Sequence, residues 1–255
     1  MRAGRLRVVG LGPGAPEWIT TEASEALATA TDLVGYGPYL ARLTERPGQH
    51  RHASDNRQEL ERARFALELA TSGRNVAVVS GGDPGIFAMA AAVMEAIETG
   101  ESDWREVDIA VVPGITAMQA AAARIGAPLG HDFCAISLSD NLKDWSIIEK
   151  RLRLASEADF VIALYNPASK ARPERIGDAF VFLRTHKSAA TPVIFARAVG
   201  RADERITVTK LGDADPGLAD MATLIIIGSS ETRLIERPGG AQPFIYTPRG
   251  YGARA

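Results

Sequence analysis

The sequence is poor in several features that would point to particular classes of protein. It has 255 residues and one cysteine, Cys134, which leaves no intrachain disulfide and no cysteine-rich zinc site. It has no run of the roughly 20 apolar residues that a membrane-spanning helix needs. The apolar run at residues 6–11 is too short for the core of a signal peptide. We therefore expect a soluble, cytoplasmic protein that is not associated with a membrane.

The sequence also lacks an excess of charge of either sign. Its 29 Lys and Arg residues against 31 Asp and Glu residues give a formal net charge of -2. Proteins that bind nucleic acids through bulk charge are strongly basic, so we expect no nucleic-acid partner. Hydrophobic residues make up 46% of the chain, which excludes an intrinsically disordered protein.

Short apolar segments alternate with longer segments of helical pattern, which is typical of an α/β protein. The expected strands are Leu6–Leu11, Asp32–Gly35, Asn75–Ser80, Val107–Val112, Phe133–Leu138, Phe160–Tyr165, Pro192–Ala196, Arg205–Lys210 and Thr223–Gly228. The expected helices are Thr21–Thr31, Arg57–Ser72, Ile86–Thr99, Ile115–Ile125, Asp144–Ser156 and Pro173–His186. The tail from Gly239 is expected to extend along the surface.

The turn Gly126–Asp132 divides this pattern into two halves with similar orders of strands and helices. We expect an N-terminal α/β domain over residues 1–126 and a C-terminal α/β domain over residues 127–255. Ligands of open α/β sheets bind beyond the carboxyl ends of the strands. The expected binding site is therefore a cleft between the two domains.

Three glycine-containing loops follow expected strands of the first half: Gly10–Gly14 (GLGPG), Ser80–Ile86 (SGGDPGI) and Pro113–Ala117 (PGITA). Glycine lets the backbone turn sharply and approach a ligand closely. The first loop alone is compatible with a tight turn needed for packing or with a dinucleotide-binding site. Two features disfavour the dinucleotide site: the loop does not read GxGxxG, and the acidic residue Asp32 lies at the start of the next expected strand and not at its end. Asp83 alone fits either an N-cap or a carboxylate beside a cationic ligand.

The order of these loops, followed by Leu164-Tyr165-Asn166-Pro167, resembles the tetrapyrrole (precorrin) methylases, which use S-adenosylmethionine. The segments Gly126–Asp140, Ala158–Pro167 and Thr247–Tyr251 make the resemblance most specific to the members that act at carbon C17. The second loop departs from the SSGDxGxYG-like pattern of those members. The resemblance implies a homodimer of two-domain α/β subunits, with the cofactor between the domains.

The resemblance also implies an activity and a set of contacts. The activity is transfer of a methyl group to C17 of precorrin-3B, a polycarboxylate tetrapyrrole, with ring contraction to precorrin-4. The positions that match cofactor contacts are Pro13, Gly81, Gly82, Asp83, Ile86, Thr116, Ala117, Asn166 and Ala198.

The chemistry of this reaction sets further expectations. Methyl transfer from a sulfonium needs alignment more than it needs a catalytic side chain, whereas ring contraction needs proton transfer. His131 and Asp140 are candidate acid or base groups, although His131 also fits a simple turn. A substrate rich in carboxylates needs local cations. The candidates are Lys143, Lys170, Arg172, Arg197, Arg201 and Arg249. Each of them also fits solvated surface charge.

Other residues are not expected to take part in the chemistry. Cys134 lies in an apolar segment and fits a small core residue. No carboxylate or cysteine has the spacing that a metal site with His50 and His52 would need, so no metal site is expected.

Several alternative functions remain compatible with the sequence. They are a methylase of another precorrin carbon, a cobalt-precorrin-3B enzyme, an NAD-dependent oxidoreductase and a non-catalytic binding module.

Overall fold

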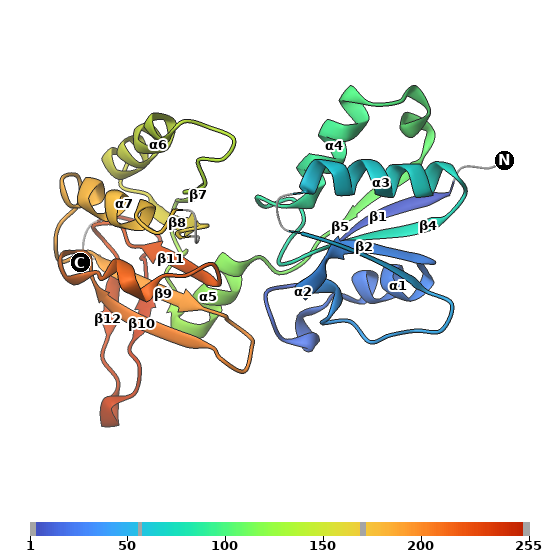
Figure 1. The fold of residues 1–255 in the computed structure, drawn as a ribbon. Coiled ribbons are helices and arrows are strands. Elements are labelled where there is room, and N and C mark those ends of the chain that lie inside the picture. Colours follow the sequence, from blue (N-terminus) through green and yellow to red (C-terminus); the bar gives the residue numbers. More distant parts are fainter. Residues whose placement is uncertain (1–3, 56–57, 169–171, 252–255) are drawn as a thin grey trace. The chain divides into compact units, whose positions relative to one another are not determined.

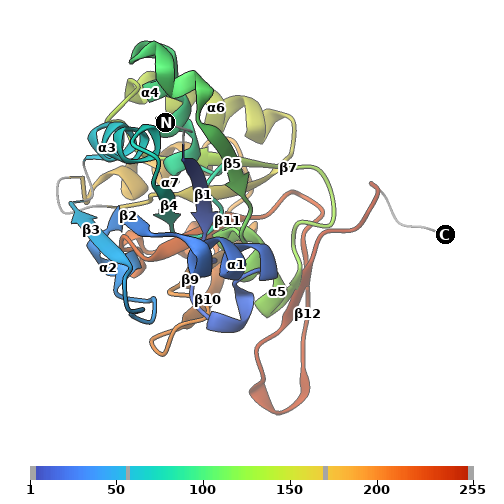
Figure 2. The same ribbon diagram turned by 90° about the vertical axis from the view of Figure 1, so that its right-hand side faces the viewer.

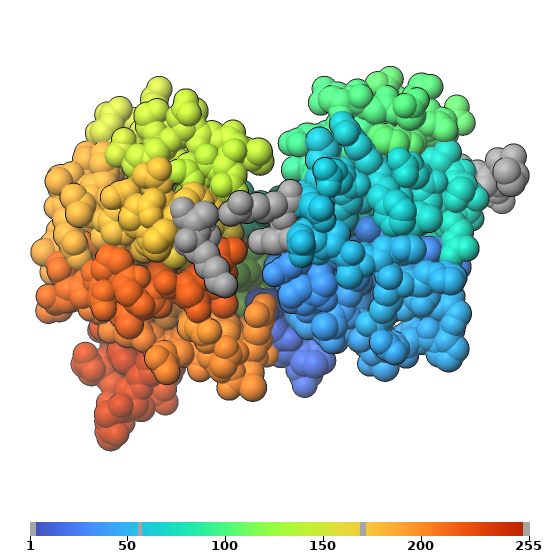
Figure 3. Space-filling model, in the orientation of Figure 1, coloured from blue at the N-terminus to red at the C-terminus, as the bar shows by residue number. Residues whose placement is uncertain are grey.

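The computed structural model describes residues 4–55, 58–168 and 172–251, and the remaining residues are grey in Figure 3. The chain divides into two compact units, Met1–Ala117 and Met118–Ala255. The division lies one helix earlier than the boundary expected at residue 126. Each unit contains a sheet flanked by helices, which confirms the α/β prediction. None of the described helices is long and apolar enough to cross a membrane.

Unit 1 is built on a five-stranded sheet in the order β3-β2-β4-β1-β5. All of its strand pairs are parallel. The strands are β1 (Arg5–Gly10), β2 (Asp32–Tyr36), β3 (His50–Ser54), β4 (Asn75–Ser80) and β5 (Asp108–Val112). The helices are α1 (Thr21–Thr29), α2 (Gly37–Leu40), α3 (Glu59–Thr71) and α4 (Met89–Thr99), with 3-10 turns η1 (Pro16–Trp18) and η2 (Ser102–Glu106).

Helices cover both faces of this sheet (Figure 1), because its central strands β1, β2 and β4 are apolar on both sides. Val8 and Val78 pack with residues of α3 and α4 on one face. Val9 and Val79 pack with residues of α1 on the other. Burial on both faces is the usual requirement of a parallel sheet. Since all five strands run in the same direction, the loops that follow β1, β4 and β5 emerge at one edge.

Unit 2 is built on a mixed sheet in the order β10-β9-β11-β8-β7. Strands β7 and β8 are parallel, and β11 is antiparallel to both of its neighbours, so β7, β8 and β9 end at one edge. The strands are β7 (Phe133–Ser137), β8 (Val161–Tyr165), β9 (Pro192–Arg197), β10 (Arg205–Lys210) and β11 (Thr223–Ile227). The other elements are α5 (Ala117–Ile125), α6 (Trp145–Glu157), α7 (Arg175–Arg184) and the 3-10 turns η3 (Leu211–Asp213) and η4 (Pro216–Leu218).

A second, three-stranded sheet in unit 2 contains the tail that was expected only to extend along the surface. Its order is β12-β13-β6, formed by β12 (Arg233–Ile235), β13 (Phe244–Tyr246) and β6 (Gly126–Ala127), with the 3-10 turn η5 (Pro238–Gly240) at the hairpin tip. Figure 2 shows this hairpin extending from the unit. Thr247, which follows β13, donates a hydrogen bond of 2.7 Å from Oγ1 to the carbonyl of Pro128.

The differences from the expected elements have identifiable physical causes. Helix α4 begins at Met89 and not at Ile86, because Phe87 has a positive φ of 51° that a right-handed helix cannot contain. Strand β3 was not predicted, because its sequence HRHAS carries no apolar run. Its pairing with β2 comes from the tertiary structure. Strands β4 and β10 have the predicted bounds.

The acidic residue at the start of β2 stabilises the opposite edge of the unit 1 sheet. The Asp32 carboxylate is 1% exposed, and it lies 2.6 Å from Arg74 Nε and 2.9 Å from His52 Nε2. Burial alone would raise the pKa of Asp32, but the hydrogen bonds from Arg74, His52 and Thr31 outweigh burial and lower the pKa to about 2. Asp32 therefore has a structural role, far from the glycine loops.

We predict that Asp32→Asn lowers the free energy of unfolding at pH 7 by about 2 kcal/mol, since one unit of pKa corresponds to about 1.36 kcal/mol. The folded-state pKa lies below the unfolded value, so this stabilisation is complete above about pH 4 and is lost as the pH falls towards 2. Urea unfolding between pH 3 and pH 7 measures the difference. Asp103→Asn is the matched control, and a pH-independent difference would contradict the prediction.

Candidate functional site

Main-chain hydrogen bonds join the first two glycine loops of unit 1. The amide of Gly12 donates to the carbonyl of Gly82 at 3.1 Å, and the amide of Gly82 donates back to the carbonyl of Gly12 at 3.0 Å. The amide of Leu11 donates to the carbonyl of Ser80 at 2.9 Å. Gly12 and Gly82 both have positive φ angles, 65° and 66°, which glycine adopts without strain.

Asp83 connects the second loop to the third. Its Oδ2 accepts a hydrogen bond of 3.0 Å from the amide of Gly114, and its Oδ1 accepts one of 2.8 Å from the amide of Gly85. The N-cap of α4 is Ala88, which makes no side-chain cap. The N-cap interpretation of Asp83 is therefore wrong, and its carboxylate holds two loops together.

The three loops approach one another more closely than side chains would allow. A Cβ atom on Gly114 would lie 2.4 Å from the carbonyl oxygen of Gly82, and one on Gly81 would lie 2.6 Å from Cζ of Tyr39. Gly82 also lies beside Thr116 and Ala117, with its Cβ position 3.9 Å from Thr116 Cα. Ile86 belongs to the same loop as Asp83, to which its amide donates at 3.3 Å.

The structure thus brings together all seven site residues that were predicted in unit 1. They are Pro13, Gly81, Gly82, Asp83, Ile86, Thr116 and Ala117. Gly81, Gly82, Asp83, Ile86 and Ala117 are each only partly buried. The edge consequently presents main-chain groups beside small side chains.

Two residues that support these loops were missed by the sequence analysis. The Arg42 guanidinium donates to the carbonyls of Leu11, Gly12 and Gly14 at 3.1–3.2 Å. The Tyr39 ring packs against Gly81 and contacts Tyr36 edge-on at 5.4 Å between ring centroids. Neither lies in a recognisable motif, and only their proximity in space reveals the role.

In unit 2, the predicted residues Asn166 and Ala198 follow β8 and β9 at the shared carboxyl edge. Both have positive φ angles, 53° and 51°, which are uncommon for residues with a side chain. The amide of Ala198 donates to the carbonyl of Ala222 at 2.9 Å, and Asn166 Nδ2 donates to Ser137 Oγ at 2.9 Å. Such backbone strain concentrates at functional sites.

The two candidate acid–base residues lie at opposite ends of β7. His131 precedes the strand, where its Nδ1 accepts the amide of Asp132 at 2.7 Å and its ring contacts Tyr251. Asp140 follows the strand and pairs with Arg172 and Arg175. The structure therefore does not bring His131 and Asp140 together.

The candidate substrate-binding cations differ in how they are engaged. Arg197 pairs with Asp203 and Asp220 at 2.7 and 2.8 Å, and it lines a hollow of about 170 Å³ with Arg205. Arg249 is exposed on the segment after β13. Lys143 and Arg172 lie at the carboxyl edge of unit 2 near Asp140. Lys170 lies outside the described residues.

Other features of the described residues do not point to chemistry. Cys134 packs against the core of unit 2, and burial raises the pKa of its thiol to about 11, so it carries no reactive thiolate near neutral pH. No group of three or more His, Cys, Asp or Glu residues among residues 4–55, 58–168 and 172–251 is arranged to hold a metal ion.

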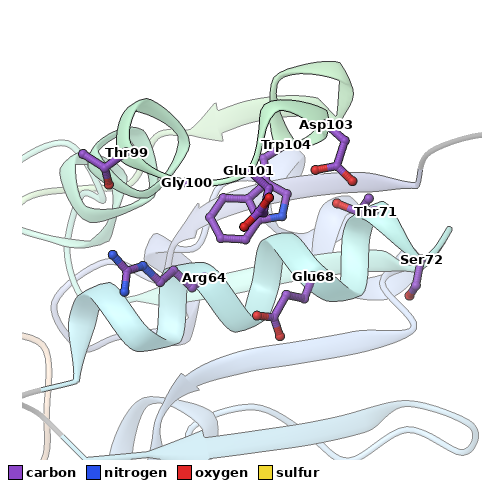
Figure 4. A pocket seen from close by; sticks show the side chains of 9 residues that line it. All are labelled: Arg64, Glu68, Thr71, Ser72, Thr99, Gly100, Glu101, Asp103 and Trp104. Atoms are coloured by element: carbon purple, nitrogen blue, oxygen red, sulfur yellow. The ribbon is translucent and has the colours of Figure 1, made fainter.

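A hollow of about 680 Å³ in unit 1 lies away from the glycine loops, beside the ends of α3 and α4 (Figure 4). Its wall carries the carboxylates of Glu68, Glu101 and Asp103 around Trp104. It contains none of the predicted site residues.

The comparisons with known proteins identify the family. The model of the tetrapyrrole (corrin/porphyrin) methylases matches residues 5–215. The chain belongs to this family. The methylase resemblance is thereby confirmed, and the chain is an enzyme of the methyltransferase class.

Individual relatives agree with this assignment. The chain is 62% identical to a precorrin-3B C(17)-methyltransferase of Sinorhizobium sp over 249 residues, or 97% of each chain. It is 43% identical to a probable cobalt-factor III C(17)-methyltransferase of Salmonella typhimurium, covering 96% of this chain and 99% of the relative. The solved structure of the methyltransferase CobJ is similar with a TM-score of 0.91 and 51% identity, covering 96% of this chain and all of that one.

We predict that Gly114→Ala destabilises unit 1 by about 1–3 kcal/mol, because its Cβ would meet a main-chain oxygen that no side-chain movement relieves. Gly37→Ala is the control, since no atom lies within 4 Å of its Cβ position. We expect that change to stay within about 0.5 kcal/mol. Equal effects of the two substitutions in urea unfolding would contradict the prediction.

Proposed function

We propose that this protein is an S-adenosylmethionine-dependent methyltransferase of corrin biosynthesis, which methylates precorrin-3B at C17 with ring contraction to precorrin-4. The proposal is supported by the 62% identity to a precorrin-3B C(17)-methyltransferase along nearly the whole chain. The observation that carries it in the structure is the set of three loops at the carboxyl edge of unit 1, held together by Gly82 and Asp83.

The residues of this edge fit the cofactor. Gly81, Gly82 and Ala117 are partly exposed, and they and the buried Thr116 carry small side chains or none. The Arg42 guanidinium is engaged with three loop carbonyls, so it fixes the loops. These groups suit a ligand recognised through peptide N–H and C=O groups. In unit 2, Asn166 and Ala198 offer further main-chain contacts from strained backbone.

These groups indicate which part of the reaction the cofactor supplies and which part the protein supplies. S-adenosylmethionine supplies a methyl group that is already activated on a sulfonium sulfur. The loops bind and orient, and orientation alone accounts for a large part of the rate of such a transfer. Fixed loops also cost little reorganisation when the ligand binds. Held by Asp83 and Arg42, these loops have their geometry before the ligand arrives.

One observation favours a second candidate substrate. The relative from Salmonella typhimurium, 43% identical over almost its full length, carries a name that refers to cobalt-factor III. A cobalt-containing macrocycle is therefore the alternative substrate at the same carbon. We further propose that the protein is cytoplasmic and that it acts as a homodimer. Analytical ultracentrifugation tests the oligomeric state.

Binding is tested by calorimetry with S-adenosylhomocysteine and, separately, with NAD. We expect heat only with S-adenosylhomocysteine. Gly81→Ala is expected to weaken that binding about tenfold, or about 1.4 kcal/mol, because the new methyl group displaces the Tyr39 ring. Gly37→Ala is again the control. The absence of heat with S-adenosylhomocysteine contradicts the proposal.

Turnover is tested with isotopically labelled cofactor and either precorrin-3B or its cobalt counterpart. We expect one labelled methyl group at C17 of a ring-contracted product, identified by mass and carbon spectra. Methylation at another carbon contradicts the proposal, and the preferred macrocycle decides between the metal-free and cobalt-containing substrates.

A further inference from the structure

A chain of charged contacts lies beyond β7 in unit 2 and begins at Arg175. Each of the three guanidinium nitrogens contacts a carboxylate. Nε and Nη2 each lie 2.8 Å from Asp140 Oδ2, and Nη1 lies 3.2 Å from Asp178 Oδ2. The guanidinium carbon also lies 4.8 Å from the centre of the Trp145 ring. Arg175 is therefore an anchor whose three nitrogens are each held by a carboxylate.

Asp140 connects Arg175 to Arg172 through its two carboxylate oxygens. While Oδ2 is held by Arg175, Oδ1 accepts a hydrogen bond of 3.0 Å from Arg172 Nη1. The Asp140 side chain is only 15% exposed. Burial alone would raise the pKa of Asp140, but the hydrogen bonds and charges of Arg175 and Arg172 hold it below the usual 3.8. Asp140 is therefore ionised near neutral pH and carries no proton to donate.

Arg172 is engaged through one nitrogen only. Nη1 contacts Asp140 and, at 3.4 Å, the carbonyl of Leu138. Nε and Nη2 have no protein partner among the described residues, although the side chain is only 16% exposed. A guanidinium held on one side with donors open on another is suited to a carboxylate.

Lys143 places a second cation beside this arginine. Its side chain is partly buried and has no ion pair or hydrogen bond within the described part of the chain. Burial lowers the pKa of Lys143, the neighbouring charges of Arg151 and Arg172 lower it further, and Asp140 opposes them. An anion bound here would relieve both the desolvation and the repulsion between like charges.

We propose that Lys143 and Arg172 form a carboxylate-binding site that grips one acidic side chain of the tetrapyrrole, and that Asp140, anchored by Arg175, is a positioning residue that aims Arg172. This inference rests on the proposed function for the identity of the ligand. It replaces the acid–base role considered for Asp140. It also separates Lys143 and Arg172 from Arg197, which is already neutralised by two carboxylates.

Steady-state kinetics with precorrin-3B test whether Lys143 and Arg172 bind a carboxylate of the substrate. Lys143→Ala and Arg172→Ala are each expected to raise KM about tenfold, within the range of charged hydrogen bonds, while kcat changes less than about twofold. The control is Arg153→Ala, an exposed arginine on α6 that pairs with Glu157, and we expect it to leave both constants unchanged. An unchanged KM in both test variants overturns the proposal.

The role of Asp140 needs readouts that a simple loss of folding would not reproduce. Asp140→Asn is expected to raise KM, keep the wild-type pH profile of kcat and bind S-adenosylhomocysteine normally, with partial rescue in Asp140→Glu. Because Asp140 acts through Arg172, adding Asp140→Asn to Arg172→Ala should raise KM no further. A collapse of kcat with loss of one limb of the pH profile overturns the positioning role.

A binding measurement separates this inference from the proposed function. Uroporphyrin III, an octacarboxylate macrocycle, is titrated into wild type, Lys143→Ala, Arg172→Ala and Arg153→Ala. We expect weaker binding in the first two variants only, and a loss of that difference in high salt. If wild type fails to methylate precorrin-3B but this pattern holds, the proposed reaction fails and the carboxylate site stands. Equal binding by all four proteins overturns the site.

Discussion

The close main-chain approach of three loops at one edge of a parallel sheet is the constraint on which the rest of unit 1 depends. Gly82 exchanges two hydrogen bonds with Gly12, and its carbonyl occupies the space where a Cβ of Gly114 would lie. Asp83 then joins the second and third loops through its two oxygens. Because these contacts use main-chain atoms and one carboxylate, the loops are fixed before any ligand binds.

The two units contribute to the proposed chemistry in different ways. Unit 1 offers main-chain groups at the glycine loops, and the guanidinium of Arg42 is engaged with loop carbonyls. Unit 2 offers cations that differ in their contacts, from Arg175, whose three nitrogens all contact carboxylates, to Lys143, which has no partner among the described residues. This difference fits the proposed function, since local cations allow a chain of net charge -2 to attract an acidic ligand.

Ion pairs in this protein position side chains as well as stabilise the fold. Asp32 and Asp140 are both largely buried carboxylates with pKa values held down by arginine. Asp32 lies at the amino ends of the unit 1 strands, where it secures β2 against Arg74 and His52. Asp140 lies at the carboxyl end of β7, where it orients a side chain with open donors. The sequence alone does not distinguish these roles.

The sequence by itself determined the α/β class, most of the strands and the three glycine loops, because apolar periodicity and glycine spacing are local properties. It also carried the family resemblance. The left-handed turn at Phe87, the pairing of β3, the Asp83 bridge and the Asp140–Arg172–Arg175 chain were decided only by tertiary structure. The physical reason, for the last three of these, is that groups far apart in the chain meet within hydrogen-bond distance, and such contacts leave no mark on local composition.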